Sequence, residues 1–146
     1  MTVSTQRSPH RFPHRFSHRI RFRECDPMGV VYHAHYIDWF EYARTEALRE
    51  WGLPYKNIQE SGISLPVVDL AIKYHKSALY DDLIVVETTP SLAPSALKLT
   101  CTYIVRRIAD DQVLATGHVT LCFLQSGRSR PVPAPMAIQD VLSAVK

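Results

Sequence analysis

Apolar residues recur at steps of three and four positions along residues 34–51, and this is the clearest periodicity in the chain. The stripe consists of Tyr36, Phe40, Ala43, Ala47 and Trp51. Because polar and charged side chains occupy the other faces, the pattern predicts a helix over Ala34–Trp51 with one buried side. Gly52 directly after the last turn and Pro54 beyond it are typical of a helix end.

Alternation of apolar and polar residues, or in one segment a β-branched and apolar run, predicts one strand before this helix and four after it. The five segments are Ser17–Glu24, Val68–Tyr74, Leu83–Leu92, Leu97–Arg106 and Val113–Phe123. The turn sequences between the last four are Asp81-Asp82, Ala93–Ser95 and Ala109–Asp111. Such short turns imply antiparallel hairpins between successive strands. Shorter helices are expected at Pro54–Glu60 and Pro135–Val145.

One amphipathic helix among five strands predicts an α+β fold in which the helix buries its apolar stripe against a sheet. A long helix laid along a curved five-stranded antiparallel sheet meets that need. Such a sheet keeps an open edge, and an unpaired edge strand favours association with another chain. We therefore expect a second copy to pair with this edge and form a homodimer.

The length of 146 residues suits a single domain. We divide the chain into a flexible basic arm over residues 1–16 and a domain over residues 17–146. The formal net charge is +3, but residues 1–23 hold six of the 17 basic residues and no acidic one. The basicity therefore belongs to the arm, and binding of nucleic acid is not expected.

Short repeats in the arm place His10, His14 and His18 four residues apart. On a helix this spacing would put the three rings on one face, as a metal site requires. Pro13 opposes a helix interior at this point. We therefore favour a mobile arm that leads into the first strand over a metal-binding or anion-binding tail.

No segment is long and apolar enough to predict a membrane span. The N-terminus lacks the apolar core of a secretory signal, so a cytoplasmic location is expected. Cys25, Cys101 and Cys122 form an odd set without a C-x-x-C pair, which opposes a disulfide framework or a zinc knuckle. Cys101 and Cys122 fall in predicted strands and are expected to be buried. No metal and no other cofactor is expected.

Asp26 lies a single loop before the start of the long predicted helix. The N-terminal end of a helix offers free backbone N–H groups and favours negative charge. A carboxylate beside it suits attack on a carbonyl, because the acid acts on the carbon or on a water while the helix end stabilises the oxyanion. Taken alone, Asp26-Pro-Met-Gly29 is also a turn sequence in which the aspartate only holds the loop.

Two segments together resemble the hotdog-fold thioesterases. They are Arg21–Tyr36, which contains an Asp-x-x-Gly-x-Val-Tyr-His core, and Glu41–Glu46, with the sequence Glu-Tyr-Ala-Arg-Thr-Glu. The chain is similar to the 4-hydroxybenzoyl-CoA thioesterase family, including its short-chain acyl-CoA branch, over roughly residues 17–131. The resemblance implies a long central helix wrapped by a curved sheet, and a homodimer that often pairs into a homotetramer. It also implies active sites between subunits and metal-free hydrolysis of an acyl-CoA substrate.

The resemblance further implies roles for individual residues. The family's catalytic carboxylate falls on Asp26, as nucleophile or general base, and its carbonyl-polarising backbone N–H falls near His33. Gly29 matches the glycine of the tight loop, and Tyr32 matches the aromatic residue before the histidine. His35 stands where many relatives have Asn. The resulting His33-x-His35 pair lacks a third ligand of clear spacing, so a metal site is not expected there.

The contacts to the substrate are less defined by the sequence. Tyr36 and Phe40, together with Trp39, are candidates for the wall of an acyl pocket and equally for the core. CoA carries phosphates, which require basic residues near the mouth of the site, and Arg128 and Arg130 after the last strand are the preferred candidates. The other candidates are Lys98, Arg106 and Arg107.

Two functions of other classes compete with thioester hydrolysis. A hotdog enoyl-CoA hydratase or dehydratase pairs a carboxylate with a catalytic histidine in a differently patterned loop. A non-catalytic module would bind the acyl group or a partner without turnover. Glu41, about one turn from the start of the helix, is a minor candidate acid, because some relatives with other motifs use a helix acid.

Overall fold

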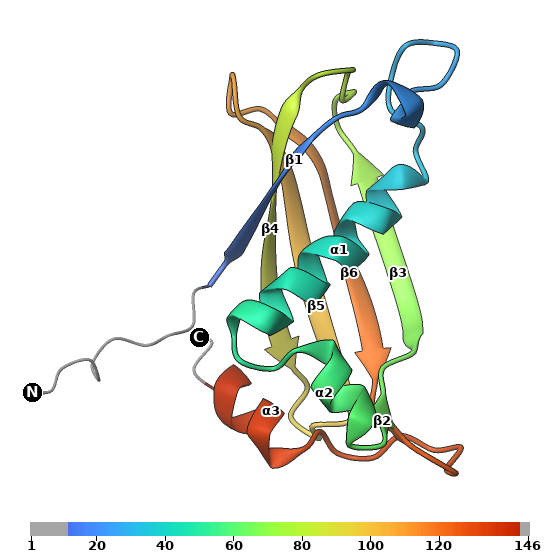
Figure 1. The fold of residues 1–146 in the computed structure, drawn as a ribbon, viewed down its shortest axis with the longest axis vertical. Helices are drawn as coiled ribbons and strands as arrows, with labels where there is room; N and C mark the ends of the chain where they lie inside the picture. Colours follow the sequence, from blue (N-terminus) through green and yellow to red (C-terminus); the bar gives the residue numbers. More distant parts are fainter. Residues whose placement is uncertain (1–11, 144–146) are drawn as a thin grey trace, which may run out of the picture.

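The computed structural model describes residues 12–143, and it has the predicted α+β architecture. Figure 1 shows the long helix α1 lying diagonally across a five-stranded antiparallel sheet. The principal elements are β1 (His14–Arg19), α1 (His35–Glu50), β3 (Val67–Tyr74), β4 (Leu83–Leu92), β5 (Lys98–Arg107) and β6 (Val113–Cys122). The smaller ones are η2 (Phe22–Glu24), α2 (Tyr55–Glu60), β2 (Ile63–Ser64), β7 (Leu124–Gln125) and α3 (Met136–Leu142).

The long helix begins and ends where its sequence pattern places it. Ala34 and Trp51 are its N-cap and C-cap residues. Gly52 follows in the left-handed region, with a φ of 82°, which glycine adopts without steric cost. The two shorter predicted helices are also present as α2 and α3, although residues 144–145 of the second prediction lie outside the described part of the chain.

The order of the strands across the sheet is β1-β4-β5-β6-β3. The hairpins β4–β5 and β5–β6 confirm two of the predicted turns. The hairpin expected between β3 and β4 is wrong, because β3 pairs with β6 at the far edge. The connecting segment 75–82 instead crosses the end of the sheet. There it bonds to the loop before α1, where the Val31 N–H donates to the Ala78 carbonyl at 2.9 Å.

The first strand differs from its prediction over Ser17–Glu24. The alternation of arginine and apolar residues continues to Glu24, but β1 ends at Arg19 and residues 22–24 form the short 3-10 helix η2. The backbone turns because the Glu24 carboxylate points inward and accepts the Arg21 N–H at 2.7 Å. Residues 14–16, which we placed in the arm, belong to β1, whereas His10 lies outside the described residues.

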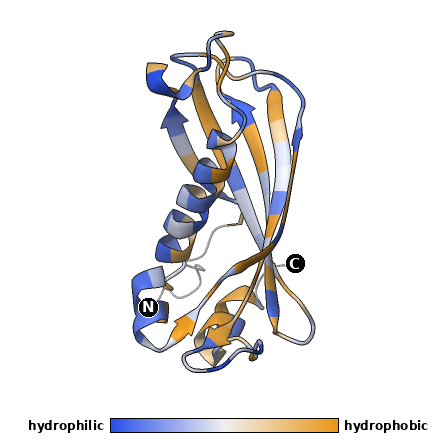
Figure 2. Cartoon of the chain, turned by 90° about the vertical axis from the view of Figure 1, so that its right-hand side faces the viewer, coloured by the Kyte–Doolittle hydropathy of each residue, from blue (hydrophilic) through white to orange (hydrophobic). Residues whose placement is uncertain are grey.

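The core lies between α1 and the inner face of the sheet. Figure 2 views the molecule from the β3 side, with α1 on one side of the strands. Phe40 is fully buried and stacks on Tyr103 of β5, with the ring centroids 4.2 Å apart. Gly117 of β6 faces the same ring, and a Cβ at this position would lie 2.6 Å from the Ala71 carbonyl oxygen and 2.9 Å from Phe40. The close approach of helix and sheet therefore requires glycine at residue 117.

The edge strands β1 and β3 differ in length, and the longer edge strand β3 is largely exposed. Val67 and Val68 at its start are about half exposed, as is Tyr74 at its end. No helix within residues 12–143 combines the length and the apolar character needed to cross a membrane.

Candidate active site

Asp26 lies on a tight turn directly before α1. Its Oδ1 accepts the Met28 backbone N–H at 2.8 Å, and its carbonyl accepts the Gly29 N–H at 2.9 Å. Gly29 has a φ of 85°, a conformation that other residues rarely adopt. The turn role recognised in the sequence is therefore present. Within residues 12–143 the second carboxylate oxygen, Oδ2, has no hydrogen-bond partner.

The first turn of α1 follows this loop without a side-chain cap. Ala34 is the N-cap residue and offers no acceptor to the helix. The His35 and Ile37 N–H groups bond to the carbonyls of Tyr32 and Ala34, respectively. The N–H groups of His33 and Ala34 have no acceptor in the described part of the chain. Two unpaired donors thus lie at the positive end of the helix dipole, near the residue for which the sequence predicted the oxyanion contact.

A short antiparallel bridge holds the Asp26 turn against the start of the helix. Cys25 and Val31 are paired, and the Tyr32 N–H donates to the Glu24 carbonyl at 2.9 Å. Asp26 therefore comes one residue after Cys25 on one side of the bridge. His33, with its free N–H, comes two residues after Val31 on the other side. No hydrogen bond joins the His33 ring to Asp26 among the described residues.

Glu24 is the functional candidate that the sequence reasoning missed. Its side chain is only 6% exposed. The Nε2 of His18 lies 3.0 Å from both of its carboxylate oxygens, and the Trp39 Nε1–H donates to Oε2 at 3.0 Å. Burial acts to raise the pKa of Glu24, but hydrogen bonds from the Arg21 backbone, Trp39 and His18 outweigh it and hold this pKa below its ordinary value. Glu24 thereby ties β1, the Asp26 loop and α1 together.

The aromatic residues around the helix start fall into exposed and buried groups. Tyr32 is about half exposed, and its ring lies 4.4 Å from that of His33. Tyr36 is buried, and burial is the main cause that raises its pKa. The Tyr74 hydroxyl of β3 donates to the His33 carbonyl at 2.8 Å. A hollow of about 190 Å³ lies here, lined by Val31, His33, Tyr36, Tyr74, His75, Lys76 and Ser77.

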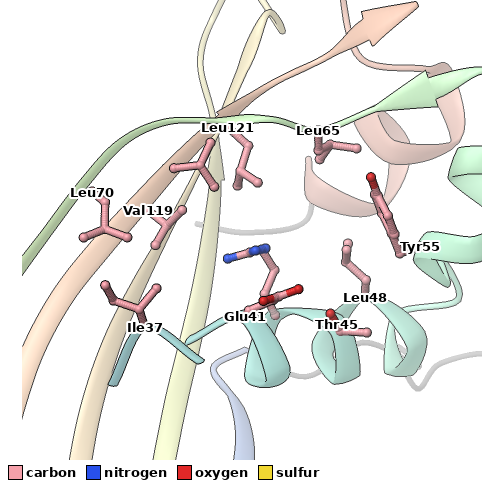
Figure 3. Close-up of a pocket in the computed structure, with 11 residues that line it drawn as sticks. Ile37, Glu41, Thr45, Leu48, Tyr55, Leu65, Leu70, Val119 and Leu121 are labelled. Atoms are coloured by element: carbon pink, nitrogen blue, oxygen red, sulfur yellow. The ribbon is translucent and has the colours of Figure 1, made fainter. Parts of the chain in front are cut away.

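A larger cavity of about 310 Å³ lies farther along α1, between this helix and the sheet (Figure 3). Its lining residues are Ile37, Glu41, Arg44, Thr45, Leu48, Tyr55, Leu65, Val67, Leu70, Val119 and Leu121. Of the three residues expected to contact the acyl group, Tyr36 lines the smaller hollow, whereas Trp39 and Phe40 line neither space and pack in the core. Ile37 is the cavity residue nearest to the start of the helix.

The candidate CoA-binding arginines lie at the opposite end of the molecule from the Asp26 turn. Arg128 and Arg130 are exposed in the loop after β7, the orange-red loop at the lower right of Figure 1. The Asp26 turn lies at the upper right, so one chain does not bring these residues together. Of the other candidates, Arg106 pairs with Glu87 at 3.2 Å and Arg107 pairs with Asp82 at 2.9 Å.

The cysteines and the histidines that the structure describes do not gather into a metal centre. Cys101 and Cys122 are buried as predicted, and burial raises the pKa of Cys101 to about 11. Cys25 is half-buried. Within residues 12–143 no group of three or more His, Cys, Asp or Glu side chains has the geometry to hold a metal ion.

The family model described as thioesterase-like superfamily matches residues 20–143. The chain belongs to the thioesterase-like superfamily. Acyl-CoA thioesterase YbgC of Haemophilus influenzae is 32% identical over 128 residues, which cover 87% of this chain and 92% of that protein. The 4-hydroxybenzoyl-CoA thioesterase of Pseudomonas sp. strain CBS-3 is 34% identical over 72 residues, which cover 47% of this chain and 51% of that protein.

Solved structures place this superfamily member among the hotdog folds. A hypothetical protein from Aquifex aeolicus matches with a TM-score of 0.82 at 30% identity, covering 89% of this chain and 99% of that one. The Pseudomonas 4-hydroxybenzoyl-CoA thioesterase structure matches with a TM-score of 0.78 at 24% identity, covering 87% and 96%. The hotdog fold and the family resemblance are confirmed. At the level of the family, the expectation of a thioester hydrolase is also confirmed, whereas the roles of individual residues stay predictions.

Proposed function

We propose that this chain hydrolyses an acyl-CoA thioester to the free acid and CoA, with Asp26 and the start of α1 as its catalytic elements. The observation that carries the proposal is the pair of unpaired N–H groups at His33 and Ala34, on the segment that the Cys25–Val31 bridge joins to the Asp26 turn, whose carboxylate has one unbonded oxygen. Membership of the thioesterase-like superfamily supports the reaction class. The cytoplasmic location expected from the sequence stays part of this proposal.

The carbonyl oxygen of the thioester accepts hydrogen bonds from the helix start. These bonds and the helix dipole stabilise the negative charge that develops on this oxygen during attack. Loss of one such donor typically costs on the order of 3 kcal/mol in the barrier. Because the donors belong to the backbone, their position is set by the fold of the loop and not by side-chain rotamers.

Asp26 acts by one of two routes, both open to its Oδ2. As general base it takes a proton from water while the water oxygen bonds to the carbonyl carbon. The C–S bond then breaks, and the CoA thiolate leaves and recovers the proton. As nucleophile it bonds to the carbon itself and expels the thiolate, giving a mixed anhydride that water cleaves. Single turnover in ¹⁸O-labelled water tests the nucleophilic route, because label enters the Asp26 carboxylate only if an anhydride forms and water attacks its aspartyl carbon.

We propose that the working unit is a homodimer, or a homotetramer built from it, with β3 at the interface. The exposed edge of β3, with Val67 and Val68 half exposed, supports this arrangement. Antiparallel pairing of two β3 edges about a two-fold axis would exchange the ends of the molecule. Arg128 and Arg130 of the second copy would then approach the Asp26 turn of the first and bind the CoA phosphates there.

Substitution of Asp26 tests the proposal. Asp26→Asn should lower kcat for release of free thiol from acyl-CoA by at least a hundredfold, while the variant stays folded. The matched control is Asp38→Asn, because Asp38 lies in the first turn of the same helix with its side chain 77% exposed. Near-normal turnover in a folded Asp26→Asn protein would remove Asp26 from the mechanism. Hydration of enoyl-CoA, or binding of acyl-CoA without turnover, would favour the competing functions.

A further inference from the structure

The cavity between α1 and the sheet has an apolar wall on the sheet side and polar and charged residues on the helix side. Figure 3 shows Leu70, Val119 and Leu121 on the sheet side, facing Glu41 and Thr45 on the helix side. Arg44 also belongs to the helix side. A cavity that only accommodated hydrocarbon would have no need of these charged groups.

Arg44 has few partners for a half-buried guanidinium. Its Nη1 donates to the Tyr103 hydroxyl at 3.1 Å, and it forms no ion pair within residues 12–143. Burial raises the pKa of Tyr103, so this partner stays a neutral phenol. Glu41, one turn earlier on the helix, also lacks an ion pair in the described part of the chain. In contrast, Arg49 on the same helix pairs with Glu46 at 3.7 Å.

The unused donors of Arg44 restrict what can fill the cavity. A guanidinium carries five N–H groups, and Tyr103 accepts from one of its nitrogens. A plain hydrocarbon chain would displace water from the remaining donors and offer no acceptor in return, which is unfavourable. A chain with an oxygen atom at this depth would restore the lost hydrogen bond.

The cavity also lies at a suitable distance from the proposed reaction centre. The smaller hollow with His33 and Tyr74, and the cavity with Ile37 and Val67, both border α1 and β3. Arg44 lies ten positions after Ala34, about 15 Å along the axis at the rise of an α-helix. Because helical side chains lean toward the N-terminus, the guanidinium lies nearer than its Cα. An acyl chain with its carbonyl at the helix start would therefore reach Arg44 with its far end.

We propose that this cavity is the acyl pocket and that Arg44 and Glu41 select aliphatic acyl-CoAs with a hydroxyl group at the far end of the chain. The inference rests on the proposed thioesterase activity. The hydroxyl oxygen accepts a hydrogen bond from Arg44, while the hydroxyl group donates a hydrogen bond to the Glu41 carboxylate. A terminal carboxylate is a poorer match, because Glu41 repels it.

Paired substrates test this specificity. Each pair consists of an unsubstituted acyl-CoA of six to twelve carbons and its ω-hydroxy form. For the chain length that fits best, kcat/KM should favour the hydroxylated form by about tenfold or more. In Arg44→Leu this ratio should fall to near one, mainly through loss of activity on the hydroxylated form. A merely structural role of Arg44 would lower both rates alike and leave the ratio unchanged.

Further variants keep the test decisive. Arg49→Leu is the matched control and should keep the wild-type ratio, since Arg49 does not line the cavity. If Arg44→Leu does not fold, Arg44→Lys takes its place and should keep only part of the preference. Glu41→Gln should raise kcat/KM for the mono-CoA ester of a dicarboxylic acid.

The outcomes separate this inference from the proposed function. An active enzyme with the same ratio in the wild type and in the Arg44 variants overturns the inference and leaves the thioesterase proposal standing. A folded wild-type protein that releases thiol from no acyl-CoA overturns the thioesterase proposal, and the inference falls with it.

Discussion

The indole N–H of Trp39 donates to Glu24 Oε2 at 3.0 Å, and this bond joins the first half of α1 to the loop that carries Asp26. The same carboxylate accepts the Arg21 backbone N–H and contacts His18 of β1. Three segments of the chain thus meet on one buried side chain. Glu24 lies two residues before Asp26, so its bonds restrict where the Asp26 turn sits relative to the helix.

Glu24→Gln should destabilise the fold. The amide keeps the size of the side chain but places an NH₂ group where a carboxylate oxygen now accepts hydrogen bonds. A buried polar group left without its partner typically costs about 1–3 kcal/mol. Urea unfolding measures the free energy, with Glu60→Gln as control, because Glu60 is exposed at the end of α2. An unchanged free energy of unfolding would contradict the role given to Glu24.

The Glu24 carboxylate should also contribute to the loss of stability of the protein in acid. The pKa of Glu24 is lower in the folded protein than its ordinary value of 4.5. Its ionised form therefore stabilises the fold above the unfolded pKa, and this contribution is lost as the pH falls through the lower folded pKa. Between pH 6 and pH 3, the melting temperature of the wild type should fall more steeply than that of Glu24→Gln. Parallel curves would show that Glu24 does not contribute to the acid sensitivity.

Gly117→Ala tests the close packing of α1 on the sheet. The added methyl group would meet the Ala71 carbonyl oxygen at 2.6 Å, and backbone cannot move aside as a flexible side chain can. Overpacking of this kind typically costs about 1–3 kcal/mol. Thermal unfolding measures the loss against Ser91→Ala, since Ser91 is exposed on β4. A variant as stable as the wild type would mean that Phe40 and β3 shift without penalty.

Reversal of both loop arginines tests the proposed contact to CoA. The double variant Arg128→Glu/Arg130→Glu should raise KM for acyl-CoA at least tenfold, because two favourable phosphate contacts become repulsive. Hydrolysis of the matching N-acetylcysteamine thioester, which lacks the phosphates, should change little. Equal losses on both substrates would count against a phosphate-binding role.

Much of the fold could be predicted because one-sided burial of a helix or strand requires apolar residues at regular intervals in the sequence. The stripe from Tyr36 to Trp51 marks α1, and alternation marks the long strands. The partner of β3 could not be predicted, because alternation records which side of a strand is buried and not which strand lies beside it. The pairs of residues in β2 and β7 are too short to show a period at all.

The site, like the fold, could be predicted only where its residues are close together in the sequence. Asp26 and the helix start are adjacent in the chain, so a local motif exposes them. Glu24, by contrast, meets Trp39 at a separation of 15 residues and His18 at a separation of six, across three elements. From the sequence, Arg44 is one of several charged residues on an amphipathic helix. Only the packing of α1 on the sheet makes it a cavity residue.

The Asp26 turn and the 126–131 loop lie at opposite ends of the molecule, and this separation predicts how two defective variants behave when they are combined. If two copies complete each other's sites, substitutions carried by different subunits can fall together in one of the two sites. A mixed dimer of one Asp26→Asn subunit and one Arg128→Glu/Arg130→Glu subunit would gather both lesions in one site and leave the other intact. At acyl-CoA concentrations well below KM, where both variants are weakly active, the two proteins unfolded and reassembled together would regain activity by complementation, approaching a quarter of the wild-type rate under random assortment.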